Sequence, residues 1–238
     1  MKKFILMVVA VLGFSFAQAQ SVVENYNAAT KAVEAKDYAK AAELFESVIN
    51  EGSEEEDETI AGCVKNAQNN LPVVYTRLGS AAAGAATKAT DAKVKDAKFA
   101  EAIAHLEKAV AKALDALSRD NKDGYFLMIE SAIIDGFGHN NDAEGLITEM
   151  KEFNNTLNYL VAYVNEHPET LLVVTADHET GGVGSNYTTY DKPLQVIFST
   201  RGHTGTVVPI FAYGSGAENF AGVMKNTDIP KKIEALIK

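Results

Sequence analysis

The 238-residue chain lacks the features that mark disulfide-bonded, nucleic-acid-binding and membrane-spanning proteins. It has a single cysteine, Cys63, so no disulfide can form within one chain. Its formal net charge is −10, which argues against a nucleic-acid partner, because phosphate backbones require clustered lysine and arginine. After Phe16 no second long apolar run follows, so no membrane span is expected.

The N-terminus carries the pattern of a cleavable secretory signal. Two lysines precede a short apolar stretch that ends at Phe16, and Ala17-Gln18-Ala19 follows. We therefore predict a signal peptide over residues 1–19 and a mature chain that is periplasmic or secreted. No cysteine lies near the cleavage site, which argues against a lipoprotein.

Residues 20–111 are rich in alanine, lysine and glutamate, with apolar residues every three or four positions, which predicts amphipathic helices. Two windows share an aromatic residue, then alanine, then a large apolar residue, then a small or branched one. The aligned positions are Tyr38, Ala41, Phe45 and Val48 in one window and Phe99, Ala102, Leu106 and Ala109 in the other. The pattern resembles tetratricopeptide repeats, whose stacked helix pairs offer a concave surface to protein partners. The windows lie further apart than one repeat, so an intervening unit is expected.

Several single residues of this helical part have structural interpretations. The acidic run over residues 53–58 is interpreted as a helix start, with Ser53 and Glu56 as a capping box, rather than as a cation site. Cys63 is expected to be a small core residue and His105 to be solvated on a helix. Further on, His167 precedes a proline and is expected to end a helix.

From residue 112 to 238 the pattern changes to that of a partial α/β sheet. Strands are predicted at about residues 124–130, 171–175, 194–199 and 206–213, with helices between and after them. The segment 141–167 predicts a helix that covers a sheet, because its apolar residues fall on one stripe. These are Leu146, Ile147, Met150, Phe153, Leu157, Leu160, Val161 and Val164. Ser215 and Glu218 fit a capping box for a helix near Phe220.

Acidic and imidazole side chains gather at the ends of these predicted strands. In an open α/β sheet the chemistry lies at the carboxyl edge of the strands, so residues that follow them are candidate ligands. Carboxylates and imidazoles are ligands that zinc prefers. The candidates are Glu130, Asp135, His139, Asp177, His178 and His203.

Four blocks of the sequence resemble the C-terminal part of alkaline phosphatases: residues 124–135, 138–143, 174–182 and 203–216. That family uses two zinc ions and a magnesium ion to hydrolyse phosphomonoesters. The resemblance implies one zinc on Asp135, His139 and His203, a second zinc on Asp177 and His178, and Glu130 as a magnesium ligand. It also implies an open sheet edge that is free to pair with another chain, because the central strands of the family pair with strands from its first half.

The blocks of the family's first half are not recognisable in this chain, so no catalytic residue is assigned. They carry the phosphorylated serine, a bridging aspartate, a magnesium-binding threonine and a phosphate-binding arginine. The alanine-rich segment 79–87 resembles the turn that bears the serine, which would make Ser80 a candidate. However, Gly79 stands where the family has an aspartate, and too few residues separate this segment from Glu130 for the missing strands. We therefore expect an exposed helix or an inter-helix segment.

Two classes of function remain open. One is a metal-dependent phosphatase that is weak or inactive alone, or that is completed by another chain. The other is a periplasmic interaction protein whose helical repeats bind a partner and whose phosphatase segment is vestigial. The change of sequence character near residues 111–114 is also compatible with a fusion of unrelated parts that has no single function.

Overall fold

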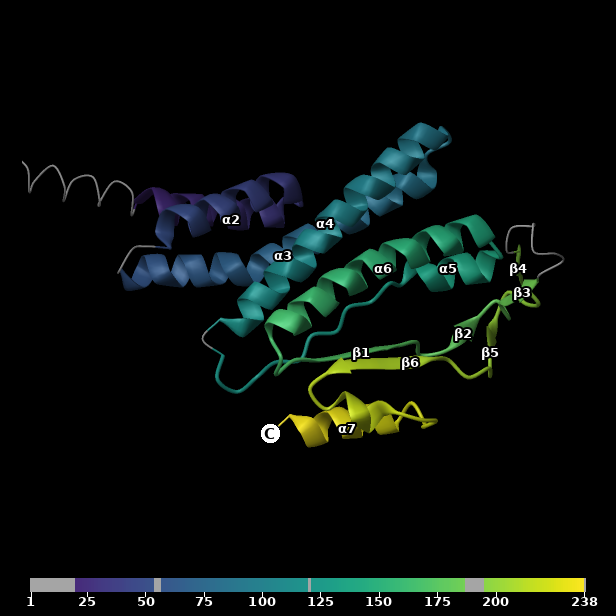
Figure 1. Cartoon of the computed structure of the whole chain (residues 1–238). Helices are drawn as coiled ribbons and strands as arrows, with labels where there is room; N and C mark the ends of the chain where they lie inside the picture. Colours follow the sequence, from purple (N-terminus) through teal and green to yellow (C-terminus); the bar gives the residue numbers. More distant parts are fainter. Residues whose placement is uncertain (1–19, 54–56, 120, 187–194, 238) are drawn as a thin grey trace, which may run out of the picture. The chain divides into compact units, whose positions relative to one another are not determined.

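The computed structural model describes residues 20–53, 57–119, 121–186 and 195–237 (Figure 1). The predicted signal peptide and Glu56 lie outside these residues. Contacts divide the chain into two compact units, residues 1–127 and 128–238, and each unit is described by itself. Within the described residues, no helix is both long and apolar enough to cross a membrane.

The first unit is helical, as predicted. A helix over residues 20–34 is followed by α2 (Tyr38–Gly52), α3 (Glu58–Lys88) and α4 (Ala92–Ser118). The first connection is tight because Lys36 adopts a left-handed conformation with φ of 60°, and the amide of Asp37 donates to the carbonyl of Ala32 at 2.8 Å. The largest fully buried side chains form one core: Val22, Phe45, Val48, Ile60, Leu71 and Val74.

Helices α3 and α4 pair closely at a glycine. A Cβ atom on Gly79 would lie 2.6 Å from Cγ of Leu106, so the absence of a side chain allows the approach. The segment 79–87 lies within α3 and presents Ala82, Ala83 and Ala86 as buried residues. The alanine-rich run is therefore helical as expected, with one face packed and Ser80 on the exposed face.

Two local predictions for this unit are wrong. The N-cap of α3 is Asp57, whose carboxylate accepts from the amides of Thr59 and Ile60, and Ser53 instead donates to the carbonyl of Ile49 at the end of α2. His105 is half-buried rather than solvated, because its Nδ1 atom is buried and its ring stacks on that of Tyr75 with centroids 6.0 Å apart. The buried core position of Cys63 is confirmed.

The repeat relationship between the two windows stays a prediction. Phe45 and Val48 are fully buried, as the first window requires. Leu106 of the second window is 38% exposed, however. The lengths also differ, since α2 has 15 residues whereas α3 and α4 have 31 and 27. A repeat of about 34 residues that contains two helices has no room for helices as long as α3 and α4.

The second unit combines helices with short strands. Its helices are α5 (Ile133–Asn140), α6 (Ala143–Glu166), the 3-10 helix η1 (Ala217–Phe220) and α7 (Asp228–Leu236). Its strands are β1 (Leu171–Thr175), β2 (Glu179–Thr180), β3 (Gly184–Asn186), β4 (Gln195–Ile197), β5 (His203–Thr204) and β6 (Ile210–Gly214). The bounds of β1 and the end of α6 at His167 confirm the predictions made for them.

The strands form three separate antiparallel pairs, β1 with β6, β2 with β5 and β3 with β4, rather than one partial sheet. The longest pair joins Leu171 to Gly214 and Thr175 to Ile210. The strand predicted at residues 124–130 is wrong, because that segment is irregular. Phe126 and Met128 in that segment are 63% and 76% exposed, whereas the alternate residues Tyr125, Leu127 and Ile129 are half-buried.

Helix α6 covers the β1–β6 pair only at its C-terminal end. Leu160 and Val164 are buried, whereas Ile147 and Met150, earlier on the predicted stripe, are 38% and 50% exposed. The pair lies between α6 and η1, and α7 packs on η1 (Figure 1). The capping box predicted near Phe220 is wrong, because Gly216 is the N-cap of η1 and no side chain caps it.

Candidate metal centre

Two of the candidate ligands come from one short helix. Asp135 and His139 lie four residues apart on α5, so one helical turn places both on the same face. The helix ends at Asn141 in a left-handed conformation, where the amide of Asn141 donates to the carbonyl of Gly138. This abrupt end leaves His139 in the last turn, next to the following loop.

The third candidate ligand, His203, comes from β5, and the pairing of β5 with β2 determines its position. In this ladder Thr180 lies opposite His203, and Glu179 lies opposite Thr204. The Glu179 carboxylate accepts hydrogen bonds from the Thr204 hydroxyl and from the amides of Val183 and Gly182, at 2.8 and 3.1 Å for the two amides. The hydroxyl donor first, and then the Val183 amide, hold the pKa of Glu179 below its ordinary value. Glu179 therefore stays ionised, and its hydrogen bonds connect Gly182 and Val183, in the loop after β2, to Thr204 on β5.

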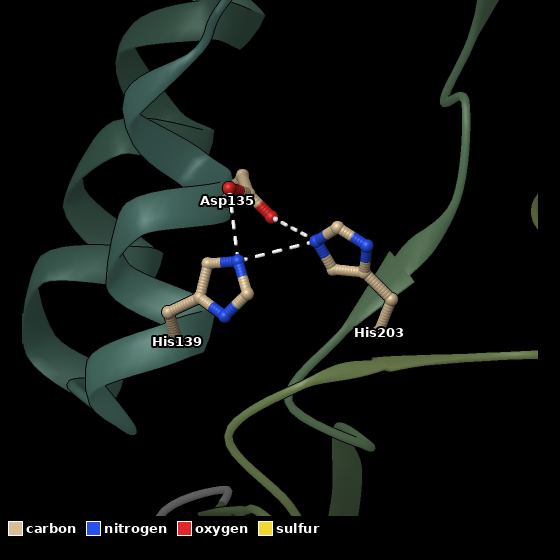
Figure 2. A group of neighbouring side chains, drawn as sticks. All are labelled: Asp135, His139 and His203. Carbon is tan, nitrogen blue, oxygen red and sulfur yellow. Dashed lines mark hydrogen bonds and ion pairs between the residues drawn. The ribbon is translucent and has the colours of Figure 1, made fainter.

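The three side chains converge on one point, as Figure 2 shows. The Nε2 atoms of His139 and His203 are 3.1 Å apart. Oδ2 of Asp135 lies 3.3 Å from Nε2 of His139, and its Oδ1 lies 3.5 Å from Nε2 of His203. A tetrahedral zinc with donors at about 2.0–2.1 Å holds neighbouring donors about 3.3–3.4 Å apart. The three donor atoms, one from each residue, lie within 4.8 Å of one another, close enough for Asp135, His139 and His203 to hold one metal ion.

A backbone carbonyl determines which ring nitrogen of His139 carries a proton. Its Nδ1 lies 2.6 Å from the carbonyl oxygen of Arg201. A carbonyl can only accept, so Nδ1 carries a proton, and whenever the ring is neutral its lone pair is on Nε2, the atom that faces Asp135 and His203. This is the outer hydrogen bond that commonly orients metal-binding histidines.

Asp135 is held in its charged form. The hydroxyl of Thr180 donates to its Oδ1 at 2.6 Å, and this bond is the main reason why the pKa of Asp135 lies below its ordinary value. The positive charges that His139, His203 and His178 carry when protonated lower the pKa of Asp135 further. A carboxylate that is ionised near neutral pH is the form that binds a cation.

The second pair of candidates lies beside this group. The ring of His178 stacks on that of His203 with centroids 3.5 Å apart, and its Nε2 lies 3.3 Å from Oδ2 of Asp177. The side chain of Asp177 is 85% exposed. Asp177 and His178 therefore supply two adjacent donors at the edge of the first group.

Glu130 and Ser80 are not part of the three-residue group. Glu130 is exposed and lies at the end of the irregular segment that precedes α5. Ser80 lies on the exposed side of α3, in the first unit. Sequence reasoning did not identify the roles of Thr180, Glu179 and the Arg201 carbonyl. The sequence offers a hint only for Glu179 and Thr180, which are polar residues directly after the candidate ligand His178.

One carboxylate and two imidazoles thus converge from α5 and β5, and these are donor types that can hold a metal ion. The sequence profile described as alkaline phosphatase matches residues 87–192 and 184–238, which together exceed half of the chain. The chain belongs to the alkaline phosphatase family.

Among curated relatives, alkaline phosphatase 4 of Bacillus subtilis (strain 168) is 28% identical over 229 residues, covering 68% of this chain and 48% of the relative. Alkaline phosphatase 3 of the same organism is also 28% identical, covering 51% of this chain and 41% of the relative. The chain therefore spans less than half the length of these relatives.

Solved structures of the same family resemble the fold. The alkaline phosphatase from the Antarctic bacterium TAB5 is 38% identical, with a TM-score of 0.51, covering 56% of this chain and 40% of that chain. A variant of the TAB5 enzyme with magnesium bound in its M3 site is 37% identical, with the same TM-score, covering 56% of this chain and 41% of that chain.

Proposed function

We propose that this chain is a zinc-dependent phosphomonoester hydrolase of the alkaline phosphatase type, with weak or no turnover by itself. The observation that carries the proposal is that one donor atom each from Asp135, His139 and His203 lie within 4.8 Å of one another, with the Nε2 atoms of the two histidines 3.1 Å apart. A zinc ion held there supplies a Lewis acid that polarises a phosphoryl oxygen. Asp135 contributes the negative charge, and the Arg201 carbonyl keeps the lone pair of His139 on the ion.

The proposal extends to the neighbouring donors. Asp177 and His178 would hold a second zinc, which the stacking of His178 on His203 supports by placing the two rings together. Glu130 as a magnesium ligand rests on the family alone, because magnesium requires several oxygens in octahedral geometry and Glu130 offers one carboxylate. The substrate class, phosphomonoesters, also rests on the family.

Weak turnover follows from the catalytic groups that the sequence does not offer. The family profile matches from residue 87, so Ser80 lies upstream of the matched region. A second chain that supplies a nucleophile would complete the site. The alternative is an interaction protein in the periplasm or outside the cell. It is supported by the first unit, which has a helical core of its own.

The test measures zinc binding and phosphatase activity on the same preparations of the full chain. Isothermal titration calorimetry gives the zinc affinity, and p-nitrophenyl phosphate gives the rate with zinc and magnesium supplied. The variant is Asp135→Ala, and the matched control is Asp96→Ala, which removes an exposed carboxylate from α4. Circular dichroism confirms that both variants fold.

We expect zinc to bind to the wild type and to the Asp96→Ala control, and to bind at least about tenfold more weakly to Asp135→Ala. A rate that chelation abolishes and that Asp135→Ala lacks supports the hydrolase. Zinc binding without such a rate favours the interaction protein with a retained metal site. Equal zinc affinity in all three proteins would overturn the metal centre.

A further inference from the structure

Thr180 lies next to three of the candidate ligands, Asp135, His178 and His203. Its hydroxyl lies 2.6 Å from Oδ1 of Asp135 and 3.2 Å from Nδ1 of His178. Its backbone is paired with that of His203 in the β2–β5 ladder. One residue therefore contacts a ligand on α5, lies opposite a ligand on β5, and contacts a candidate ligand of the neighbouring position.

The direction of these hydrogen bonds follows from counting protons. The hydroxyl has one proton, and the charged carboxylate of Asp135 can only accept, so this proton goes to Asp135. The oxygen of Thr180 is then left to accept, and Nδ1 of His178 must be the donor. A neutral His178 consequently has its proton on Nδ1 and its lone pair on Nε2, the atom that lies next to Asp177.

The rest of the threonine side chain is held in place by α5. A Cβ atom placed on Gly138 would lie 3.0 Å from Cγ2 of Thr180 and 2.9 Å from its carbonyl oxygen, so helix and strand are in close contact there. A β-branched side chain has few accessible rotamers, and the closeness of α5 leaves little free space around this one. The hydroxyl is thus fixed between its two partners.

We propose that Thr180 is a positioning residue that links the two metal positions, orienting Asp135 for the first ion and the lone pair of His178 for the second. The proposal rests on the proposed function, since it concerns the same metal ions. It predicts that removal of the Thr180 hydroxyl weakens metal binding at both positions. Thr180 itself binds no metal.

The experiment compares Thr180→Val, which keeps the shape and removes the hydroxyl, with Thr180→Ser, which keeps the hydroxyl. Thr148→Val is the matched control, because Thr148 on α6 is exposed and donates to the carbonyl of Glu144 within its own helix. Zinc affinity is measured by calorimetry on the full chain. The tautomer of His178 is read from its imidazole nitrogen chemical shifts in the metal-free chain, at mildly alkaline pH.

We expect Thr180→Val to lower zinc affinity about 10- to 100-fold, the usual effect of losing an outer hydrogen bond to a ligand, and to shift His178 away from the Nδ1–H tautomer. Thr180→Ser should stay within a few-fold of the wild type and keep the tautomer, and Thr148→Val should match the wild type in both.

Two results separate this proposal from the proposed function. Wild-type zinc affinity and an unchanged tautomer in Thr180→Val would overturn the role of Thr180 while leaving the metal centre intact. A wild-type chain that binds no zinc would overturn the proposed function. In that case the tautomer alone decides whether Thr180 orients His178, because it is measured without metal.

Discussion

Gly138 provides a sharp test of how α5 is held against β2. It is buried in the last turn of α5, and a Cβ atom there would lie 2.9 Å from the carbonyl oxygen of Thr180 and 3.1 Å from its Cβ. The carbonyl oxygen of Thr180 is a backbone atom that cannot rotate away, so the added methyl group of Gly138→Ala must displace β2. Gly136 lies on the same helix, and a Cβ atom there would meet no atom of the described residues within 4 Å, which makes Gly136→Ala the matched control.

The expected magnitude follows from two opposing effects. Replacing a helical glycine with alanine stabilises the helix by about 0.5–1 kcal/mol at either position. Overpacking costs about 1–3 kcal/mol and applies only to Gly138→Ala. The helix effect cancels in the comparison, so Gly138→Ala should be less stable than Gly136→Ala by about 1–3 kcal/mol. Gly136→Ala should be more stable than the wild type.

The displacement of β2 in Gly138→Ala should also alter the candidate metal centre. Ordinary contact begins at 3.4 Å, so the Thr180 backbone must move by roughly half an ångström. The hydrogen bond from Thr180 to Asp135 would lengthen, and zinc affinity should fall about tenfold or more in Gly138→Ala and stay unchanged in Gly136→Ala. Urea denaturation followed by circular dichroism and a zinc titration measure the two effects. Equal stability and equal zinc affinity in the two variants would refute the reasoning.

Two further predictions concern the helical unit. Burial first, and then the hydrogen bond and the charge of Glu46, raise the pKa of Tyr75 above its ordinary value near 10. The unfolded chain therefore loses this proton at lower pH than the folded chain, and stability should fall as the pH rises above about 10. Tyr75→Phe should reduce that slope in urea denaturation across this range, and identical slopes would contradict the assignment. Asp57→Ala should cost about 1 kcal/mol by removing the N-cap of α3, whereas Asp57→Asn keeps a capping oxygen and should be nearly neutral. Equal urea midpoints for the two Asp57 variants would exclude that capping role.

The sequence predicted the elements whose signals are local. The helices of the first unit and α6 follow from apolar residues repeated every three or four positions, a pattern that each helix carries within itself. The bounds predicted for β1 agree with the structure because its apolar run ends in residues that break a strand. The candidate ligands were recognised by residue type and by resemblance to a family.

Other predictions failed where the outcome depends on partners. The segment 124–130 has the apolar residues of a strand, but a strand forms only when another segment supplies its hydrogen bonds, and this segment is irregular. Strands β2 and β5 have two residues each, too few for any periodic signal. The capping residue of α3 was misplaced by a few positions, since Ser53 and Asp57 are both good N-cap residues by composition alone.

Residue type and spacing were thus enough to predict the helices and strand β1, because each of these depends on a few neighbouring residues, and together with the resemblance to a family they pointed to the candidate donor side chains. The convergence of Asp135 and His139 with His203, which lies 64 positions after His139, depends on how β5 pairs with β2 and how α5 packs against it. The role of Thr180 depends on the same packing, because its hydroxyl meets a carboxylate 45 residues earlier in the chain. Such contacts are set by the three-dimensional arrangement of segments, which a local pattern does not contain.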